Sequence, residues 1–233
     1  MNIVISGASK GIGKAITEKF AASNNNIFIC SRNEKELAST TKEINSKYNN
    51  SVAFFAADLT NKNDVINFTN WILGKSDTID VLINNAGQFI PGSIFNEEDG
   101  VLEKMISFNL FSAYYLTRAL LPYMMKKKSG HIFNMSSIAA LSAYHNGGSY
   151  SISKYALMGF SKNLREEMKP YNIKVTTVYP GAVYTSSWNE SGVLPQRIME
   201  AGDIANMVYT TSLLSPQACV EDIVMRPLLG DLP

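Results

Sequence analysis

Cysteine and histidine are scarce in this sequence, whose 233 residues contain two of each. The two cysteines, Cys30 and Cys219, cannot form the several disulfides that hold small secreted domains together. We therefore expect a reducing, cytoplasmic location. No grouping of cysteines and histidines has a spacing typical of a zinc site, so we expect no metal.

The sequence also lacks an excess of charge and a long apolar run. Its net charge is +1, which gives no electrostatic footprint for nucleic acid. The basic run at 126–128 precedes Ser129 and Gly130 at the expected end of a helix, where the helix dipole favours cations. No apolar run reaches membrane-spanning length, and a predicted strand at the start of the chain leaves no room for a signal peptide. We expect neither nucleic acid nor membrane as a partner.

Short apolar runs alternate with amphipathic helical patterns along the whole chain. Most of the runs are apolar on both alternating faces, which is typical of buried parallel strands. The pattern predicts an α/β protein with one Rossmann-fold domain over 1–233, a doubly wound, seven-stranded parallel sheet with helices on both faces. The predicted strands are 3–5, 27–30, 52–56, 81–83, 131–135, 175–179 and 223–225. The predicted helices lie near 12–20, 34–48, 61–74, 97–128, 150–169 and 202–214.

The segment 101–125 is apolar almost all round. One sheet cannot cover every side of a helix, so a second face must be buried against something else. A subunit interface is one explanation, and a core helix enclosed by its own chain is the other.

Glycines follow the first predicted strand with the spacing G-x-x-x-G-x-G, at Gly7, Gly11 and Gly13. A tight turn needs residues without a Cβ, and phosphates can approach the backbone closely at a helix N-terminus. The position between a strand and an amphipathic helix favours a dinucleotide-binding loop over an ordinary turn.

The end of the second predicted strand should meet the ribose that carries the adenine. A carboxylate there would bind the 2'-hydroxyl of NAD, but the sequence has Ser31 and Arg32, with Lys10 nearby in the glycine loop. Two cations suit a 2'-phosphate, which favours NADP(H). Glu34, two residues further on, keeps NAD(H) possible, and both cations could instead be solvated surface side chains.

Tyr150 and Lys154 are four residues apart and would share one face of a helix. A free tyrosine, with a pKa near 10, is a slow acid or base at pH 7, and lowering that pKa by ~3 units requires about 4 kcal/mol. An ammonium at ~4 Å supplies roughly this much at an effective dielectric of about 20. We therefore expect Lys154 to lower the pKa of Tyr150.

Spacing alone does not identify the catalytic pair, because Tyr123 and Lys127 are also four residues apart. Ser137 follows the fifth predicted strand, at the sheet edge where ligands bind in open α/β sheets, and can hydrogen-bond a substrate carbonyl. Tyr123 has no such serine before it and is predicted to pack. Tyr150 is therefore the candidate general acid or base.

Together these motifs resemble the short-chain dehydrogenase/reductase family over nearly the whole chain. The resemblance rests also on "ADL", on "NNAG" at 84–87, on "SFNLFS" and on "YPGAVYT". It implies the catalytic set Asn109, Ser137, Tyr150 and Lys154, with Asn109 holding a water that relays protons to the lysine. It implies cofactor contacts at Gly7, Ser9, Lys10, Gly11, Ile12, Gly13, Ser31, Arg32, Asp58, Leu59, Asn85, Ala86, Gly87, Tyr150, Lys154, Pro180, Gly181, Val183 and Thr185.

The resemblance also implies an oxidoreductase that transfers hydride between NADP(H) and a carbonyl or secondary alcohol. A homodimer or homotetramer would form through the helices at 97–128 and 150–170. The alternative is a non-catalytic, dinucleotide-binding redox sensor or regulatory protein of the same fold. Epimerases and dehydratases of this fold usually carry a longer C-terminal region than this chain has.

Three predicted loops, at 88–96, 138–149 and 183–200, should frame the substrate. They contain many apolar side chains, which suits a ketone, aldehyde or secondary alcohol with a hydrophobic portion. The candidate substrate residues are Phe89, Tyr144, His145 and Trp188. The aromatic residues could instead pack the loops, and His145 could be an ordinary loop residue.

Overall fold

The computed structural model describes residues 1–48, 52–185, 188 and 192–232. In this part of the chain seven parallel strands form one sheet in the order β3-β2-β1-β4-β5-β6-β9. The predicted fold class is confirmed. The strands are β1 (Asn2–Ser6), β2 (Asn26–Ser31), β3 (Val52–Ala56), β4 (Val81–Asn84), β5 (Gly130–Met135), β6 (Ile173–Pro180) and β9 (Asp222–Met225).

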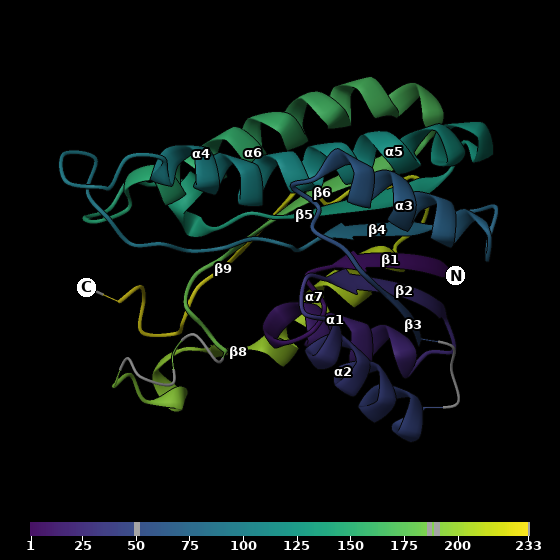
Figure 1. Cartoon of the computed structure of the whole chain (residues 1–233), viewed down its shortest axis with the longest axis horizontal. Coiled ribbons are helices and arrows are strands. Elements are labelled where there is room, and N and C mark those ends of the chain that lie inside the picture. The colour runs from purple at the N-terminus through teal and green to yellow at the C-terminus, as the bar shows by residue number, and fades with distance from the viewer. Residues whose placement is uncertain (49–51, 186–187, 189–191, 233) are drawn as a thin grey trace.

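Helices cover both faces of the sheet (Figure 1). Side chains alternate between the faces along a strand, so Ile3 and Ile5 pack in one core while Val4 packs in the other. All three are fully buried. The first core contains residues of α1 (Gly11–Ala21), α2 (Glu34–Lys47) and α7 (Ala201–Ser212). The second contains residues of α3 (Lys62–Leu73), α5 (Ser112–Lys127) and α6 (Gly148–Met168).

The strand order reverses next to β1. The chain runs outward from β1 to β2 and β3, then returns to pair β4 with the other side of β1, with Ile5 opposite Ile83. In an open α/β sheet the crevice outside the carboxyl ends of such neighbouring strands is the usual ligand site. The fold therefore places the glycine loop after β1 and the "NNAG" segment after β4 side by side.

The helix predicted at 97–128 is shorter and interrupted. It begins at Val101, after Gly100 in a left-handed conformation with φ of 86°. It is α-helical as α4 (Val101–Ile106), becomes a π-helix, η1 (Ser107–Phe111), and continues as α5. The four residues from 97 to 100 form a turn region, because a left-handed residue cannot continue a right-handed helix.

Smaller elements also differ from the prediction. A pair of two-residue strands, β7 (Val183–Tyr184) and β8 (Met199–Glu200), lies within the predicted 183–200 loop. Within the described ranges, short 3₁₀ turns follow β5, α6 and β7: η2 (Ile138–Ala140), η3 (Lys169–Tyr171) and η5 (Pro195–Arg197). Residues 186–187 and 189–191 of that loop lie outside the described residues.

The apolar segment 101–125 keeps an uncovered side. Its inner side chains, such as Leu116, are fully buried in the core, whereas Leu102 and Phe111 are 43% and 39% exposed. Tyr123, predicted to pack, is also 36% exposed, so this chain covers it only in part. The sequence left two explanations for this segment, a subunit interface and a core helix enclosed by its own chain. Enclosure by its own chain is wrong for the exposed face.

No helix in the described ranges is long and apolar enough to cross a membrane. The same residues contain no group of three or more histidine, cysteine, aspartate or glutamate side chains that could hold a metal ion.

Candidate active site

The glycine loop is joined to the end of β4 by hydrogen bonds. The Ser6 hydroxyl accepts the main-chain N–H groups of Asn85 and Ala86, each at 3.0 Å. In return, the Asn85 side-chain amide donates to the carbonyls of Ser6 at 3.1 Å and Gly7 at 2.9 Å. Gly7 has a φ of 64°, which favours glycine. These contacts fix the shape of the loop without any bound molecule.

Gly13 allows α1 to begin against this loop. A Cβ at Gly13 would overlap the carbonyl oxygen of Gly7 and the Asn85 amide. Lys10, the N-cap residue of α1, is extended, and no described side chain caps the helix. The first turn also contains no acidic residue. Its N–H groups and the positive end of the helix dipole are therefore left for an anion such as a phosphate.

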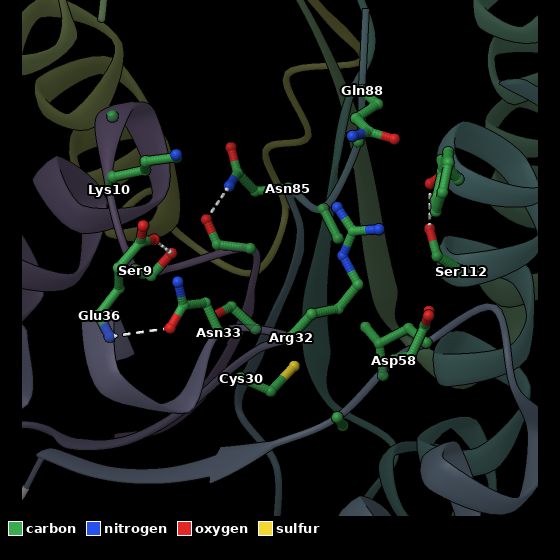
Figure 2. A pocket seen from close by; sticks show the side chains of 18 of the residues that line it. Ser9, Lys10, Cys30, Arg32, Asn33, Glu36, Asp58, Asn85, Gln88 and Ser112 are labelled. Carbon is green, nitrogen blue, oxygen red and sulfur yellow. Dashed lines mark hydrogen bonds between the residues drawn. The ribbon is translucent and has the colours of Figure 1, made fainter. Parts of the chain in front are cut away.

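A cleft of about 750 Å³ lies outside the carboxyl ends of the strands (Figure 2). Its size is that of a site for a small molecule or cofactor. The structure brings most of the predicted cofactor contacts together in its walls. The predicted residues that line it are Gly7, Ser9, Lys10, Gly11, Ile12, Ser31, Arg32, Asp58, Leu59, Asn85, Ala86, Gly87 and Thr185.

The other predicted contacts do not line this cleft. Gly13 is enclosed behind the glycine loop, and Val183 is buried in the first core. Pro180 is the last residue of β6. At Gly181 the missing side chain leaves room for Pro227 and Asp231 of the C-terminal segment. Tyr150 and Lys154 lie on α6 and are also outside the lining of the cleft.

Cations and carboxylates share the walls of the cleft. Figure 2 shows Arg32 extending between the wall that carries Lys10 and the wall that carries Ser112. The Arg32 guanidinium lies over the Phe108 ring, 4.8 Å from its centroid. The carboxylates are those of Glu36 and Asp58, and Glu36 accepts a hydrogen bond from the Ser9 hydroxyl at 3.4 Å.

Glu34, considered from the sequence as a ribose contact, is not among the residues that line the cleft, whereas Glu36 is. Asn33 caps α2, its side-chain oxygen accepting the N–H of Glu36 at 3.2 Å. Glu36 is therefore the third residue of the helix, and its carboxylate contacts the Ser9 hydroxyl in the glycine loop. The pattern Asn-x-x-Glu before a helix could have identified it.

Lys154 lies in the second turn of α6 and is 6% exposed. Its Nζ donates to the Met135 carbonyl at the end of β5, at 2.9 Å. Burial disfavours the ammonium and lowers the pKa of Lys154 to about 8. The same Nζ lies 5.7 Å from the ring centroid of Tyr150.

Tyr150 lies one turn earlier on α6, beside Ser137. Burial raises the pKa of Tyr150 above its usual value, and a hydrogen bond with the Ser137 side chain acts in the opposite direction. Ser137 is the N-cap residue of η2, and its hydroxyl also accepts the N–H of Ala139 at 3.1 Å. Contrary to the expected lowering by Lys154, the pKa of Tyr150 is raised in this structure, because the removal of water from the phenol is the largest cause.

Asn109 is buried in the π-helix and uses its whole side chain for internal contacts. Its amide donates to the Gln88 carbonyl at 2.9 Å and to the Ser153 hydroxyl at 2.9 Å. Its oxygen accepts the N–H of Gln88 at 2.8 Å. The side chain thus joins the loop after β4 to α6. The water expected on Asn109 stays a prediction.

The predicted substrate residues divide into two pairs. The Phe89 ring packs edge-on against Tyr150, with centroids 4.8 Å apart. Tyr144 is 47% exposed, and burial of the hydroxyl together with the charge of a nearby Tyr150 raises its pKa to about 12. His145 is exposed, and Trp188 is half-buried, with its main-chain N–H donating to the Thr185 carbonyl. The structure therefore brings Phe89 and Tyr144 to the tyrosine.

A family model described as short chain dehydrogenase matches residues 1–193. The chain belongs to the short-chain dehydrogenase/reductase family. The family resemblance read from the sequence is confirmed, and with it the assignment as an oxidoreductase.

Relatives and solved structures of this family match the chain along its full length. A sepiapterin reductase of Chlorobaculum tepidum is 32% identical over 240 residues, which cover 99% of this chain and 97% of the relative. A metagenomic short-chain oxidoreductase in complex with NADP is 28% identical, with a TM-score of 0.84 and coverage of 97% and 96%. An alcohol dehydrogenase of Thermococcus sibiricus complexed with 5-hydroxy-NADP, 22% identical with a TM-score of 0.91 and coverage of 100% and 98%, shares the fold.

Proposed function

We propose that this short-chain dehydrogenase/reductase is an NADP(H)-dependent carbonyl reductase or alcohol dehydrogenase. The observation that carries the proposal is the grouping of Ser137, Tyr150 and Lys154 at the end of β5 and the start of α6. All three side chains are wholly or partly removed from water, and the tyrosine hydroxyl contacts the serine. Such a group can hold and protonate a carbonyl oxygen.

The cleft fits a dinucleotide. Gly7 and Gly11 have φ of 64° and 56°, and a Cβ at Gly7 would lie within 3 Å of Ala86, so only a bare backbone forms this cradle. The uncapped first turn of α1 would hold the phosphates. Lys10 and Arg32 would hold a 2'-phosphate, which supports NADP(H), as does the relative solved with NADP. Glu36 keeps NAD(H) a possible cofactor, because its carboxylate could accept a 2'-hydroxyl.

When it is bound, the nicotinamide supplies a hydride to the substrate carbon or accepts one from it. Tyr150, protonated at neutral pH because burial raises its pKa, donates its proton to the carbonyl oxygen as the alcohol forms. Ser137 holds that oxygen. Lys154, with a pKa of about 8, is mostly charged at pH 7 and stabilises the phenolate left behind. Asn109 fixes the position of α6 through Ser153.

The rim of the site favours an apolar carbonyl compound. Phe89 is 55% exposed and packs on the reacting tyrosine, and Tyr144 is 47% exposed beside it. Two aromatic side chains with open faces suit a flat or apolar substrate. Sepiapterin belongs among the compounds tested, because a relative is named for its reduction.

We further expect a homodimer or homotetramer through the helices at 97–128 and 150–170. Large apolar side chains of α6, such as Ile152 and Tyr155, are 41% and 40% exposed, like those of α4 and the π-helix. A second subunit would remove them from water. The cytoplasmic location stays a prediction from the sequence.

The test is NADPH oxidation over a panel of ketones, aldehydes and sepiapterin, followed at 340 nm. At least one compound should be reduced, and NADPH should raise the melting temperature more than NADH at equal concentration. Equal stabilisation by the two nucleotides would show that the cations at Lys10 and Arg32 do not select NADP(H). Nucleotide binding without any turnover would favour the non-catalytic redox sensor.

A further inference from the structure

Glu97 contacts the start of the helix that carries Tyr150. It lies in the connection between β4 and α4, and its Oε1 accepts the main-chain N–H of Ser149 at 2.9 Å. Its Oε2 accepts the hydroxyl of the same serine. The two residues are 52 positions apart, and Ser149 is 2% exposed. One carboxylate thus joins two distant segments immediately before Tyr150.

This contact replaces a local cap that α6 lacks. Its N-cap residue, Gly147, makes no side-chain cap hydrogen bond within the described structure, and the first turn contains no acidic residue. The first N–H groups of a helix need acceptors, and its N-terminus is stabilised by negative charge. Glu97 provides the acceptor and the charge from outside the helix.

Two glycines make room for the carboxylate. A Cβ at Gly148 would overlap Oε1 of Glu97 and the carbonyl of Gly92. A Cβ at Gly92 would lie too close to Cγ of Glu97. Gly148 also has a φ of 33°, which a residue with a side chain rarely adopts. The packing around Glu97 is therefore close on both sides.

The connection between β4 and α4 also holds together the two loops beside Tyr150. The N–H of Gly92 donates to the Asn146 carbonyl at 3.2 Å, and the Ser93 hydroxyl donates to the Asn146 side chain at 2.6 Å. These bonds join the 88–96 loop to the 138–149 loop. Phe89, at the other end of the first loop, packs on Tyr150. The carboxylate sits where both loops meet the helix.

We propose that Glu97 is a positioning residue that fixes the first turn of α6 and the 88–96 loop, and so holds Tyr150 in place for proton transfer. The catalytic part rests on the proposed function, whereas the effect on the position of Tyr150 does not. Glu97 does not line the nucleotide cleft, so its loss should change the turnover number and leave the KM for NADPH unchanged.

The kinetic test compares Glu97→Ala and Glu97→Gln with Glu98→Gln, the exposed neighbour, as control. Loss of the cap should lower kcat about tenfold in Glu97→Ala. Glu97→Gln should keep most of the activity, because an amide can still accept the Ser149 N–H and donate to its hydroxyl. Glu97→Ala/Ser149→Ala should be no worse than Glu97→Ala alone, since the two side chains act as one unit.

A second measurement follows Tyr150 without needing turnover. Protein containing 3-fluorotyrosine gives ¹⁹F NMR lines, and the Tyr150 line is the one that Tyr150→Phe removes. It should shift or broaden in Glu97→Ala and stay unchanged in Glu98→Gln. If Glu97→Ala does not fold, Ser149→Ala replaces it and should change the line in the same way but by less, because the main-chain N–H at position 149 still donates to Glu97.

The two measurements separate the two proposals. A wild-type kcat together with an unmoved Tyr150 line in Glu97→Ala would overturn the role of Glu97. If the wild-type protein reduces no carbonyl compound, the proposed function fails, and the ¹⁹F line alone then decides whether Glu97 positions Tyr150.

Discussion

His131 makes the folding stability of this protein sensitive to acid. The side chain lies on β5, is 3% exposed and stacks on Phe133 with ring centroids 3.9 Å apart. Its Nε2 is 2.7 Å from the Thr176 hydroxyl oxygen. Because that hydroxyl donates its own hydrogen to the Val220 carbonyl, Nε2 carries the proton of a neutral ring. Nδ1 has no hydrogen-bond partner among the described residues.

Protonation of Nδ1 would place a charged donor without an acceptor in the core. Burial, with the charge of Lys174 as a smaller cause, accordingly lowers the pKa of His131 from 6.5 to about 3. Between these two values the unfolded chain binds a proton that the folded chain does not, so stability falls as the pH falls. The loss from pH 7 to pH 5 is about 2 kcal/mol, and the melting temperature should drop by roughly 4–8 °C in a chain of this size.

Urea unfolding at several pH values, compared between the wild type and His131→Gln, measures how much His131 contributes to the pH dependence of the free energy of unfolding. Carboxylates titrate equally in both proteins, so the difference between the two curves isolates His131. We expect the difference to change by about 2 kcal/mol between pH 7 and pH 5 in the direction that favours the variant at low pH. Parallel curves would refute the reasoning, because they would mean that the folded protein accommodates a charged His131.

Two other substitutions test the cleft. Glu36→Gln should shift the ratio of the affinities for NADPH and NADH several-fold toward NADPH, because it removes a carboxylate that would repel a 2'-phosphate. Titrations with both nucleotides measure this ratio. An unchanged ratio would mean that Glu36 does not influence the choice of cofactor. Gly13→Ala should weaken nucleotide binding and lower the melting temperature, because its Cβ would overlap the glycine loop. Gly159→Ala, within α6 and with no atom within 4 Å of the added Cβ, is the matched control and should stabilise by up to about 1 kcal/mol. Equal effects of both alanines would contradict the close-packing argument.

The fold could be predicted from the sequence because buried parallel strands leave a strong local signal. Runs such as 3–5 and 81–83 are apolar on both faces and stand next to turn residues, which is sufficient to place the strands and to predict a doubly wound parallel sheet. The glycine spacing and the tyrosine–lysine pair are also local patterns. The sheet brings them to the same edge, because the glycine loop follows β1 and Lys154 of α6 donates to the Met135 carbonyl at the carboxyl end of β5.

The features that were missed depend on distant contacts or on burial. The π-helix that holds Asn109 follows no sequence signal that we can name. Glu97 acts on a serine 52 positions away, so no local pattern reveals it. The direction of the Tyr150 pKa depends on how much water the folded chain excludes, which spacing cannot show.

Removal of the Tyr150 hydroxyl tests most directly the central claim that this tyrosine protonates the substrate carbonyl. Tyr150→Phe removes the proton donor and keeps the ring that packs on Phe89. With the best carbonyl substrate and saturating NADPH, kcat should fall by about 10²–10⁴-fold, while the melting-temperature shift caused by NADPH stays close to the wild-type value. Turnover within tenfold of the wild type would contradict the assignment of Tyr150 as the acid that protonates the substrate.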